Sequence, residues 1–184
     1  MKAKDENEKY IAFLRGINVG GHHKVPMAQL KTELEQLGFE NITTILNSGN
    51  IIFDAKVENT DKIENTISAH LENHFKFTIP TIVRKSENIH KLFLAQPFQN
   101  VTLTKDIRLY VSFLKSETDS ELLLPWKSED ESYEIISKTD KSILSILDLS
   151  VSKTPKAMEA LEKYFGKDIT TRNWNTIEKV EKKL

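Results

Sequence analysis

The residues best suited to chemistry lie in one segment, residues 14–27, which reads LRGINVGGHHKVPM. Three glycines, one arginine and one lysine stand there between an apolar stretch and an amphipathic one, and the segment has no acidic residue. The first N–H groups of a helix lack partners and carry partial positive charge, and glycine lets a backbone approach a ligand closely. The segment is therefore suited to bind an anion or a polar ligand, without indicating which one.

Two further clusters contain polar residues beside expected strands. Asn47-Ser48-Gly49-Asn50 is typical of a turn between strands, and Asn173 follows Arg172 just before an expected helix. We name as candidate ligand-binding residues Arg15, Gly16, Asn18, Gly20, Gly21, Lys24, Ser48, Gly49, Asn50, Arg172 and Asn173. An alternative for the first segment is a surface loop whose glycines serve only its turns.

Other types of site are not indicated. The glycine spacing matches neither a Walker loop nor the Gly-x-Gly-x-x-Gly dinucleotide motif. Ser48 reads as a turn residue in preference to a nucleophile, because Asn and Gly supply the positive φ that a hairpin needs. His70 and His74 have the i, i+4 spacing that can bind zinc, but no further ligand is in view. We therefore assign no catalytic residue, no metal site and no cofactor.

Composition excludes several classes of protein. The 184 residues carry a formal net charge of 26 − 27 = −1, which argues against a general nucleic-acid coat or a membrane-surface binder. The chain has no cysteine, so disulfides and thiolate metal sites are excluded. Its first ten residues are charged and do not form a secretory signal, and no apolar run approaches a membrane span. We expect a cytoplasmic protein.

Hydrophobic periodicity predicts an α+β fold of two similar halves. In the first half we expect strands over 10–14, 43–46, 51–53 and 81–84, with helices over 26–38 and 61–75 and a linking helix over 86–95. In the second we expect strands over 107–113, 133–137, 143–148 and 169–172, with helices over 120–124 and 154–165 and a terminal helix from 174. Both orders are β-α-β-β-α-β, that of two consecutive ferredoxin-like subdomains with antiparallel sheets. We place the subdomains at 1–96 and 97–184.

Finer expectations concern faces and caps. Strand 107–113 alternates in character, which predicts one buried and one polar face, the polar one carrying Arg108, Tyr110 and Ser112. Asp61 and Glu64 form a capping pair in the expected second helix. Trp174 begins the apolar stripe of the terminal helix and should be buried, with Asn173 as the helix cap.

Topology then brings two of the clusters together. In a ferredoxin-like sheet, the strand order is 4-1-3-2 and the first strand runs antiparallel to the third. The loop over 15–25 and the turn over 47–50 should therefore lie at the same end of the sheet. The loop is also longer than a usual βα connection, and long loops on rigid scaffolds often carry function. If the two halves pack with matching ends together, Arg172 and Asn173 join them in one cleft.

Three motifs in this order, LRGINVGGHHKVPM, NSGNIIF and TTRNWNTIEKV, resemble the bacterial family catalogued as "domain of unknown function 1697". Its signature positions correspond to Arg15, Gly16, Asn18, Gly20, Gly21, Lys24, Met27, Ser48, Gly49, Asn50, Arg172, Asn173 and Trp174. The family carries no assigned reaction, so the resemblance implies a fold and a site region but no activity. His22-His23 departs from the family's more usual pair, which argues against a catalytic role for these histidines.

The favoured hypothesis is a binding protein or small enzyme that holds an anionic or nucleotide-like small molecule at the loop, ordered by Arg15 and Lys24. One alternative is a nucleic-acid-associated module that uses open sheet faces. It is disfavoured because the strand over 49–54 has no set of stacking aromatics beyond Phe53. A third is a protein-interaction module without a small-molecule site. The oligomeric state is not specified by the sequence.

Overall fold

The computed structural model describes residues 7–118 and 122–184. The chain divides into two compact units, one formed by Met1–Lys91 with Lys179–Leu184 and the other by Leu92–Glu178. The boundaries between the units fall within α3 (Ser86–Leu94) and α5 (Trp174–Glu181). The subdomain limits expected from the sequence, 1–96 and 97–184, stay predictions. No helix of the described residues combines the length and the apolar character that crossing a membrane requires.

The first unit contains a four-stranded sheet of order β2-β3-β1-β4 in which all neighbours are antiparallel. Its elements are, in chain order, β1 (Asn7–Leu14), α1 (Met27–Gln36), β2 (Glu40–Ile45), β3 (Asn50–Lys56), α2 (Thr60–Phe75) and β4 (Thr81–Lys85). Every strand and helix expected in this half is present, with ends that differ by a few residues.

The central strand β1 is buried on both faces, as its continuous apolar run predicts. It pairs with β3 in the expected antiparallel direction, and the register places Ile11 opposite Ile52 and Ala12 opposite Ile51. Tyr10 and Ala12 belong to the core on the helix side, and Ile11 on the other face is also fully buried. This doubly buried strand fixes the position of the loop that follows it.

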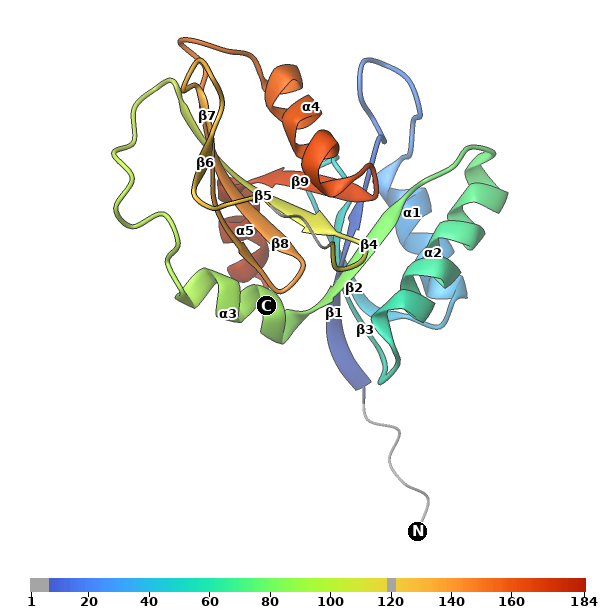
Figure 1. Ribbon diagram of the computed structural model, residues 1–184. Coiled ribbons are helices and arrows are strands. Elements are labelled where there is room, and N and C mark those ends of the chain that lie inside the picture. The colour runs from blue at the N-terminus through green and yellow to red at the C-terminus, as the bar shows by residue number, and fades with distance from the viewer. Residues whose placement is uncertain (1–6, 119–121) are drawn as a thin grey trace. The chain divides into compact units, whose positions relative to one another are not determined.

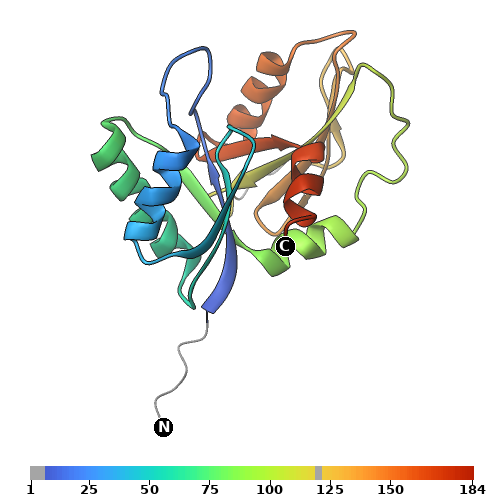
Figure 2. The ribbon, with the colours of Figure 1, turned by 180° about the vertical axis from the view of Figure 1, so that it is seen from behind.

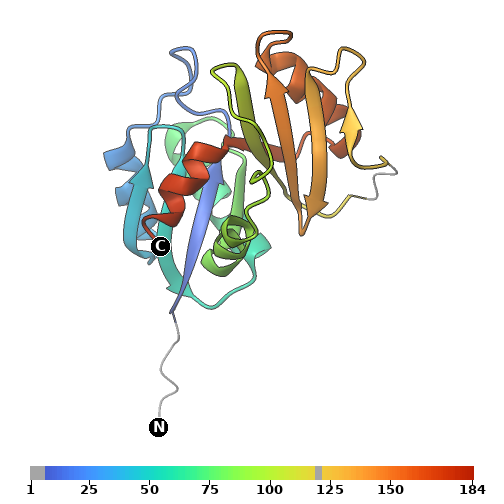
Figure 3. The same cartoon turned by 90° about the vertical axis from the view of Figure 1, so that its left-hand side faces the viewer.

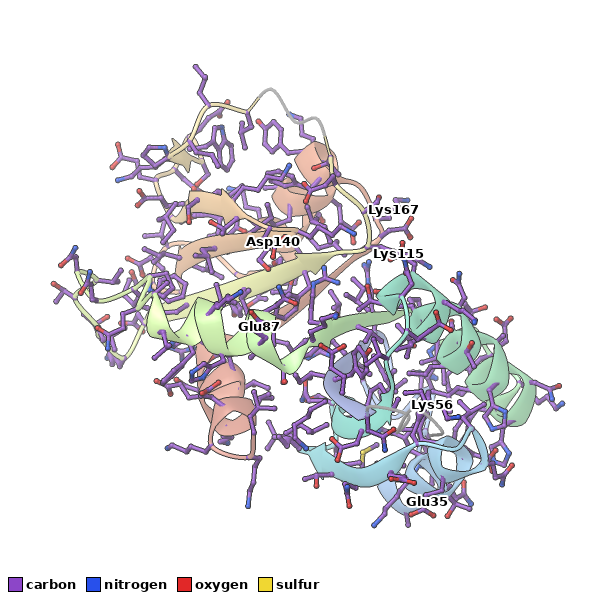
Figure 4. All side chains as sticks on the ribbon, turned by 90° about the horizontal axis from the view of Figure 1, so that it is seen from below. Glu35, Lys56, Glu87, Lys115, Asp140 and Lys167 are labelled. Carbon is purple, nitrogen blue, oxygen red and sulfur yellow. The ribbon has the colours of Figure 1, made fainter. Side chains whose placement is uncertain are left out.

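Helices α1 and α2 cover the same face of the first sheet (Figure 1). Leu30 and Leu34 of α1 and Ile67 of α2 are completely buried there. Glu35 lies on the exposed side of α1 (Figure 4). The helix ends as predicted, with Gly38 in the left-handed region at φ 82° just beyond it.

The expected capping pair of α2 is wrong. Its N-cap is Asn59, whose side-chain oxygen accepts a hydrogen bond from the N–H of Asp61 at 2.8 Å. Glu64 does not reach back to the cap, because it is fully buried and its carboxylate accepts the N–H of Val83 on β4 at 2.8 Å. Its oxygen also lies 3.7 Å from the guanidinium of Arg84. The carboxylate therefore joins α2 to the sheet.

The second unit contains a five-stranded antiparallel sheet of order β6-β7-β8-β5-β9. Its strands are β5 (Ile107–Leu114), β6 (Trp126–Lys127), β7 (Tyr133–Thr139), β8 (Ser142–Asp148) and β9 (Ile169–Asn173), and α4 (Thr154–Phe165) precedes β9. Figure 3 shows the β7–β8 hairpin with α4 behind it. The hairpin, α4 and its end at Gly166 agree with the sequence prediction.

Two expectations for this unit are corrected. Residues 122–125 are not helical and lead into β6, a strand that the sequence pattern did not predict, while residues 119–121 of the expected helix lie outside the described part. So short a helix would not repay its nucleation cost, and Pro125 disfavours it further. The polar face expected on β5 is also wrong at Ser112, which is fully buried and hydrogen-bonds across the sheet to Thr171 at 2.7 Å.

Candidate functional site

The loop between β1 and α1 is closed on itself by one side chain. The Asn18 carboxamide oxygen accepts the N–H of Val25 at 2.8 Å, and its nitrogen donates to the Val25 carbonyl at 3.0 Å. The same nitrogen donates to the carbonyl of Asn47 at 2.8 Å. Asn18 itself adopts φ 55°, a conformation that asparagine tolerates better than most residues. Its amide is thus used to hold the loop together, which makes it a positioning residue.

The tip of the loop is a tight turn. The N–H of His22 donates to the carbonyl of Val19 at 3.0 Å, and the two residues between them, Gly20 and Gly21, have φ values of 58° and 79°. An added Cβ at either glycine would meet no atom within 4 Å. These two glycines are therefore required by backbone conformation and not by close packing.

The turn over residues 47–50 is shaped by Gly49. Its φ is 75°, and an added Cβ would lie 2.6 Å from the Leu14 Cβ and 2.9 Å from the Ile17 Cδ1. Asn50 is completely buried, and its side-chain nitrogen donates to the Ile45 carbonyl at 2.9 Å and to the Ser48 hydroxyl at 3.0 Å. Only glycine fits at position 49, where the turn presses against the start of the loop.

Loop and turn lie together at one end of the first sheet, as the topology predicted (Figure 2). Besides the bond from Asn18 to Asn47, the N–H of Leu14 donates to the carbonyl of Gly49 at 2.8 Å. The loop and the turn thus form one surface at the end of the first strand. This surface contains nine of the predicted residues: Arg15, Gly16, Asn18, Gly20, Gly21, Lys24, Ser48, Gly49 and Asn50.

Positive charge prevails along this surface. Arg15 is half-buried and Lys24 is exposed, and the segment between them has no acidic residue. Helix α1 begins two residues after Val25 with Pro26 as its N-cap, which provides no side-chain cap, and its first turn contains no acidic residue. The partial positive charge of this helix terminus is therefore not offset by a carboxylate of its own first turn.

The histidines of the loop have different surroundings. The His23 ring stacks on Phe77 with centroids 4.4 Å apart, and its Nδ1 lies 3.2 Å from the Gly16 carbonyl. His22 is exposed at the turn. Stacking and the backbone contact account for His23 without a catalytic role.

The third predicted cluster lies in the second unit. The Arg172 guanidinium donates to the Thr170 hydroxyl at 2.9 Å and to the Thr171 carbonyl at 3.0 Å, and burial lowers its pKa to about 10. It therefore remains positively charged at neutral pH. Asn173 is a helix cap, as predicted, because its side-chain oxygen accepts the N–H of Asn175 at 3.0 Å.

Sequence reasoning missed a carboxylate that accounts for two histidines. Glu33 of α1 is buried, with one oxygen 2.8 Å from His70 Nε2 and the other 3.2 Å from His74 Nδ1. The i, i+4 histidine spacing was visible, but nothing in the pattern showed that Glu33 would face it. No group of three or more His, Cys, Asp or Glu in residues 7–118 and 122–184 could hold a metal ion.

The first unit does not support the alternative that nucleic acid binds on open sheet faces. Ile11 and Phe13 of β1 and Ile52 of β3 are exposed by 2% or less, and they lie on the face away from α1 and α2. Recognition of single-stranded nucleic acid on a sheet requires accessible aromatic side chains. The central strands offer none on either face.

Comparisons with known proteins agree with this fold. The family model described as "Protein of unknown function (DUF1697)" matches residues 8–143. The solved structure of conserved bacterial protein SP0830 from Streptococcus pneumoniae is similar to this chain, with a TM-score of 0.72 and 25% sequence identity over 96% of this chain and 98% of that chain. A search of curated proteins gave no match.

Proposed function

The chain belongs to the DUF1697 family of proteins of unknown function, and from its site we propose that it binds a small anionic or nucleotide-like molecule at the loop over residues 15–25. The observation that carries the proposal is the joining of this cationic, acid-free loop to the 47–50 turn through Asn18. A rigid scaffold that fixes a polar loop is a common setting for ligand binding.

Three kinds of chemical group would bind the ligand. Arg15 and Lys24 supply positive charge, the first turn of α1 supplies N–H donors, and Ser48 supplies a hydroxyl at the turn. Gly16, Gly20, Gly21 and Gly49 set the backbone path, and Asn50 and Asn18 hold the turn and the loop in place. Arg172 and Asn173, which belong to the second unit, are a second candidate for contact with an anion.

We also propose that both units follow the ferredoxin-like arrangement, although the described residues of the second unit include no helix between β5 and β7. The order β7-β8-β5-β9 corresponds to β2-β3-β1-β4, with β6 as an addition at one edge. For location we propose the cytoplasm, which suits a chain without cysteine. A small anionic molecule is the proposed partner in preference to nucleic acid or a membrane.

The proposal is tested by thermal unfolding and calorimetry with inorganic phosphate, AMP and neutral adenosine. A ligand that binds only the folded state stabilises it, so the melting temperature rises with ligand concentration. At a concentration of 100 times the Kd, the free energy of unfolding increases by about 2.7 kcal/mol. We expect phosphate and AMP to do so and adenosine not to.

Variants locate the effect. Lys24→Ala should weaken AMP binding by roughly ten- to a hundredfold, because a charge-assisted hydrogen bond contributes about 1.5–3 kcal/mol. Lys31→Ala is the matched control, since Lys31 is an exposed lysine on α1 that pairs with Glu35 outside the loop. Asn18→Ala keeps every charge but removes the hydrogen bonds that close the loop and join it to the 47–50 turn. This variant should also weaken AMP binding. No response to either anion, or equal losses with Lys24→Ala and Lys31→Ala, would overturn the proposal.

A further inference from the structure

The second unit contains a cavity that the proposed function does not use. It has a volume of about 390 Å³ and is lined by residues of α4 and by residues that join β6 to β7. This size is within the usual range for sites that bind small molecules. Ala157 and Ala160 form its wall on the helix, where their small side chains leave room.

Three aromatic residues, Trp126, Tyr133 and Tyr164, also line the cavity. Trp126 meets Tyr164 with ring centroids 5.1 Å apart at 64°, and it meets Tyr133 at 6.5 Å and 71°. Rings at such angles present faces in different directions. Trp126 is half-buried, and its indole N–H makes no hydrogen bond with any residue that the structure describes. The aromatic wall therefore combines apolar surface with the indole N–H of Trp126 as a donor.

The charges around the cavity favour a cation. Asp130 and Lys156 pair with each other, so they neutralise one another. Three charged residues remain on the lining, Glu129, Glu159 and Lys163, and none of them forms an ion pair within the described part of the chain. The sum of their formal charges is 1 − 2 = −1. The Tyr164 ring already attracts an ammonium group, because the Lys163 nitrogen lies 5.4 Å from its centroid.

We propose that this cavity binds an alkylammonium cation, held by the faces of Trp126 and Tyr164 and by the carboxylates of Glu129 and Glu159. Aromatic faces attract organic cations through the ring quadrupole, and the carboxylates add direct charge attraction. The same chemistry is present in a free diamine and in a lysine side chain of a peptide. Lys163 competes with the ligand for the Tyr164 ring.

The experiment follows the two tryptophan indole N–H signals of the full chain by NMR, with Trp126→Phe used to assign them. The probes are 1,5-diaminopentane and Nα-acetyl-lysine methylamide, with butyrate as the probe of opposite charge. We expect saturable movement of the Trp126 signal with an amine, no movement of the Trp174 signal, and no response to butyrate. The amine that binds more tightly identifies the source of the cation.

Substitutions of the acidic and the basic residues on the cavity lining should change amine binding in opposite directions. The double variant Glu129→Gln, Glu159→Gln should weaken amine binding by about tenfold, because it removes both carboxylates that attract the cation. Glu131→Gln, a matched change on the same turn but outside the cavity, should leave binding unchanged, and so should Lys24→Ala in the first unit. Lys163→Met removes the competing ammonium and should strengthen binding. Absence of saturable amine binding, equal binding of butyrate, or weaker binding with Lys163→Met would overturn the proposal.

Discussion

The two units share an order of strands and differ in the segment that connects the first strand of each to the next element. In the first unit, β1 leads through the 15–25 loop and the N-cap Pro26 into α1. In the second unit, the described residues after β5 form an irregular segment that leads into the short strand β6. The remaining strands correspond, β2-β3-β1-β4 to β7-β8-β5-β9. The sheet is therefore common to both units, and the segment after the first strand distinguishes them.

Both proposed sites arise where the units differ. In the first unit that segment carries the cationic loop, which Asn18 and Gly49 hold against the sheet. In the second it ends at Trp126, which lines the cavity beside α4. Ladder hydrogen bonds and burial constrain the strands strongly, while a surface connection can change without loss of the core. We infer that the shared sheet supports both of the proposed binding surfaces.

The largest effect on stability is expected in the second unit at Trp174. This side chain is 8% exposed, as the sequence predicted, and it packs on Phe93 and Phe98 with ring centroids 6.3 and 5.1 Å away. Trp174→Ala should lower the free energy of unfolding by roughly 3–5 kcal/mol because it leaves a large cavity. Chemical denaturation measures the change, and Trp126→Ala at a half-buried position should cost less. A loss under about 1 kcal/mol would show that Trp174 does not stabilise this core.

The next effect separates two kinds of glycine in the first unit. Gly49→Ala combines a strained left-handed conformation with overlap against Leu14 and Ile17, and should cost roughly 2–5 kcal/mol. Gly21→Ala has the strain without the overlap and should cost about 1–2 kcal/mol. Denaturant titration of both variants tests this order. Equal costs would mean that the 47–50 turn can move away from β1.

The smallest effect is expected at the β6–β7 connection, which has no counterpart in the first unit. Hydrogen bonds from Lys156, Ser132 and Ser128 hold the pKa of Asp130 well below its usual value. A lowered pKa in the folded state stabilises the protein above the unfolded pKa of about 3.9 and loses this contribution as the pH falls through the folded value. The stability difference between the wild type and Asp130→Asn, measured by thermal unfolding, should therefore be constant near neutral pH and shrink below about pH 4. A difference that grows in acid would contradict this assignment.

Much of the fold could be predicted from apolar periodicity. The doubly apolar runs of β1 and β3 predicted central strands, and their pairing is as expected. Two residues alone could not predict β6, since Trp126 and Lys127 show no period. Ser112 and Glu64 are polar by type but buried through partners distant in sequence, which a local pattern does not contain.

The candidate site was predictable in its location but less so in the division of roles. Glycines and cations indicated the loop, and the topology placed the 47–50 turn beside it. The sequence pattern did not distinguish Asn18 from Lys24 as a ligand-binding residue. The role of Asn18 in closing the loop became clear only from its hydrogen bonds to Val25 and Asn47. Asn47 is 29 positions away from Asn18 in the sequence, so a local pattern does not contain this contact.

The central claim is that the first unit binds an anion at its loop, and NMR titration of the isotopically labelled chain with AMP tests it most directly. The account predicts saturable shifts of the backbone amides of Gly16, Gly20, Gly21 and Ser48, with the Trp126 indole signal unmoved. Lys24→Ala should require a higher AMP concentration for the same shifts, and Lys31→Ala should not. Shifts confined to the second unit, or an unchanged spectrum at saturating AMP, would contradict the claim.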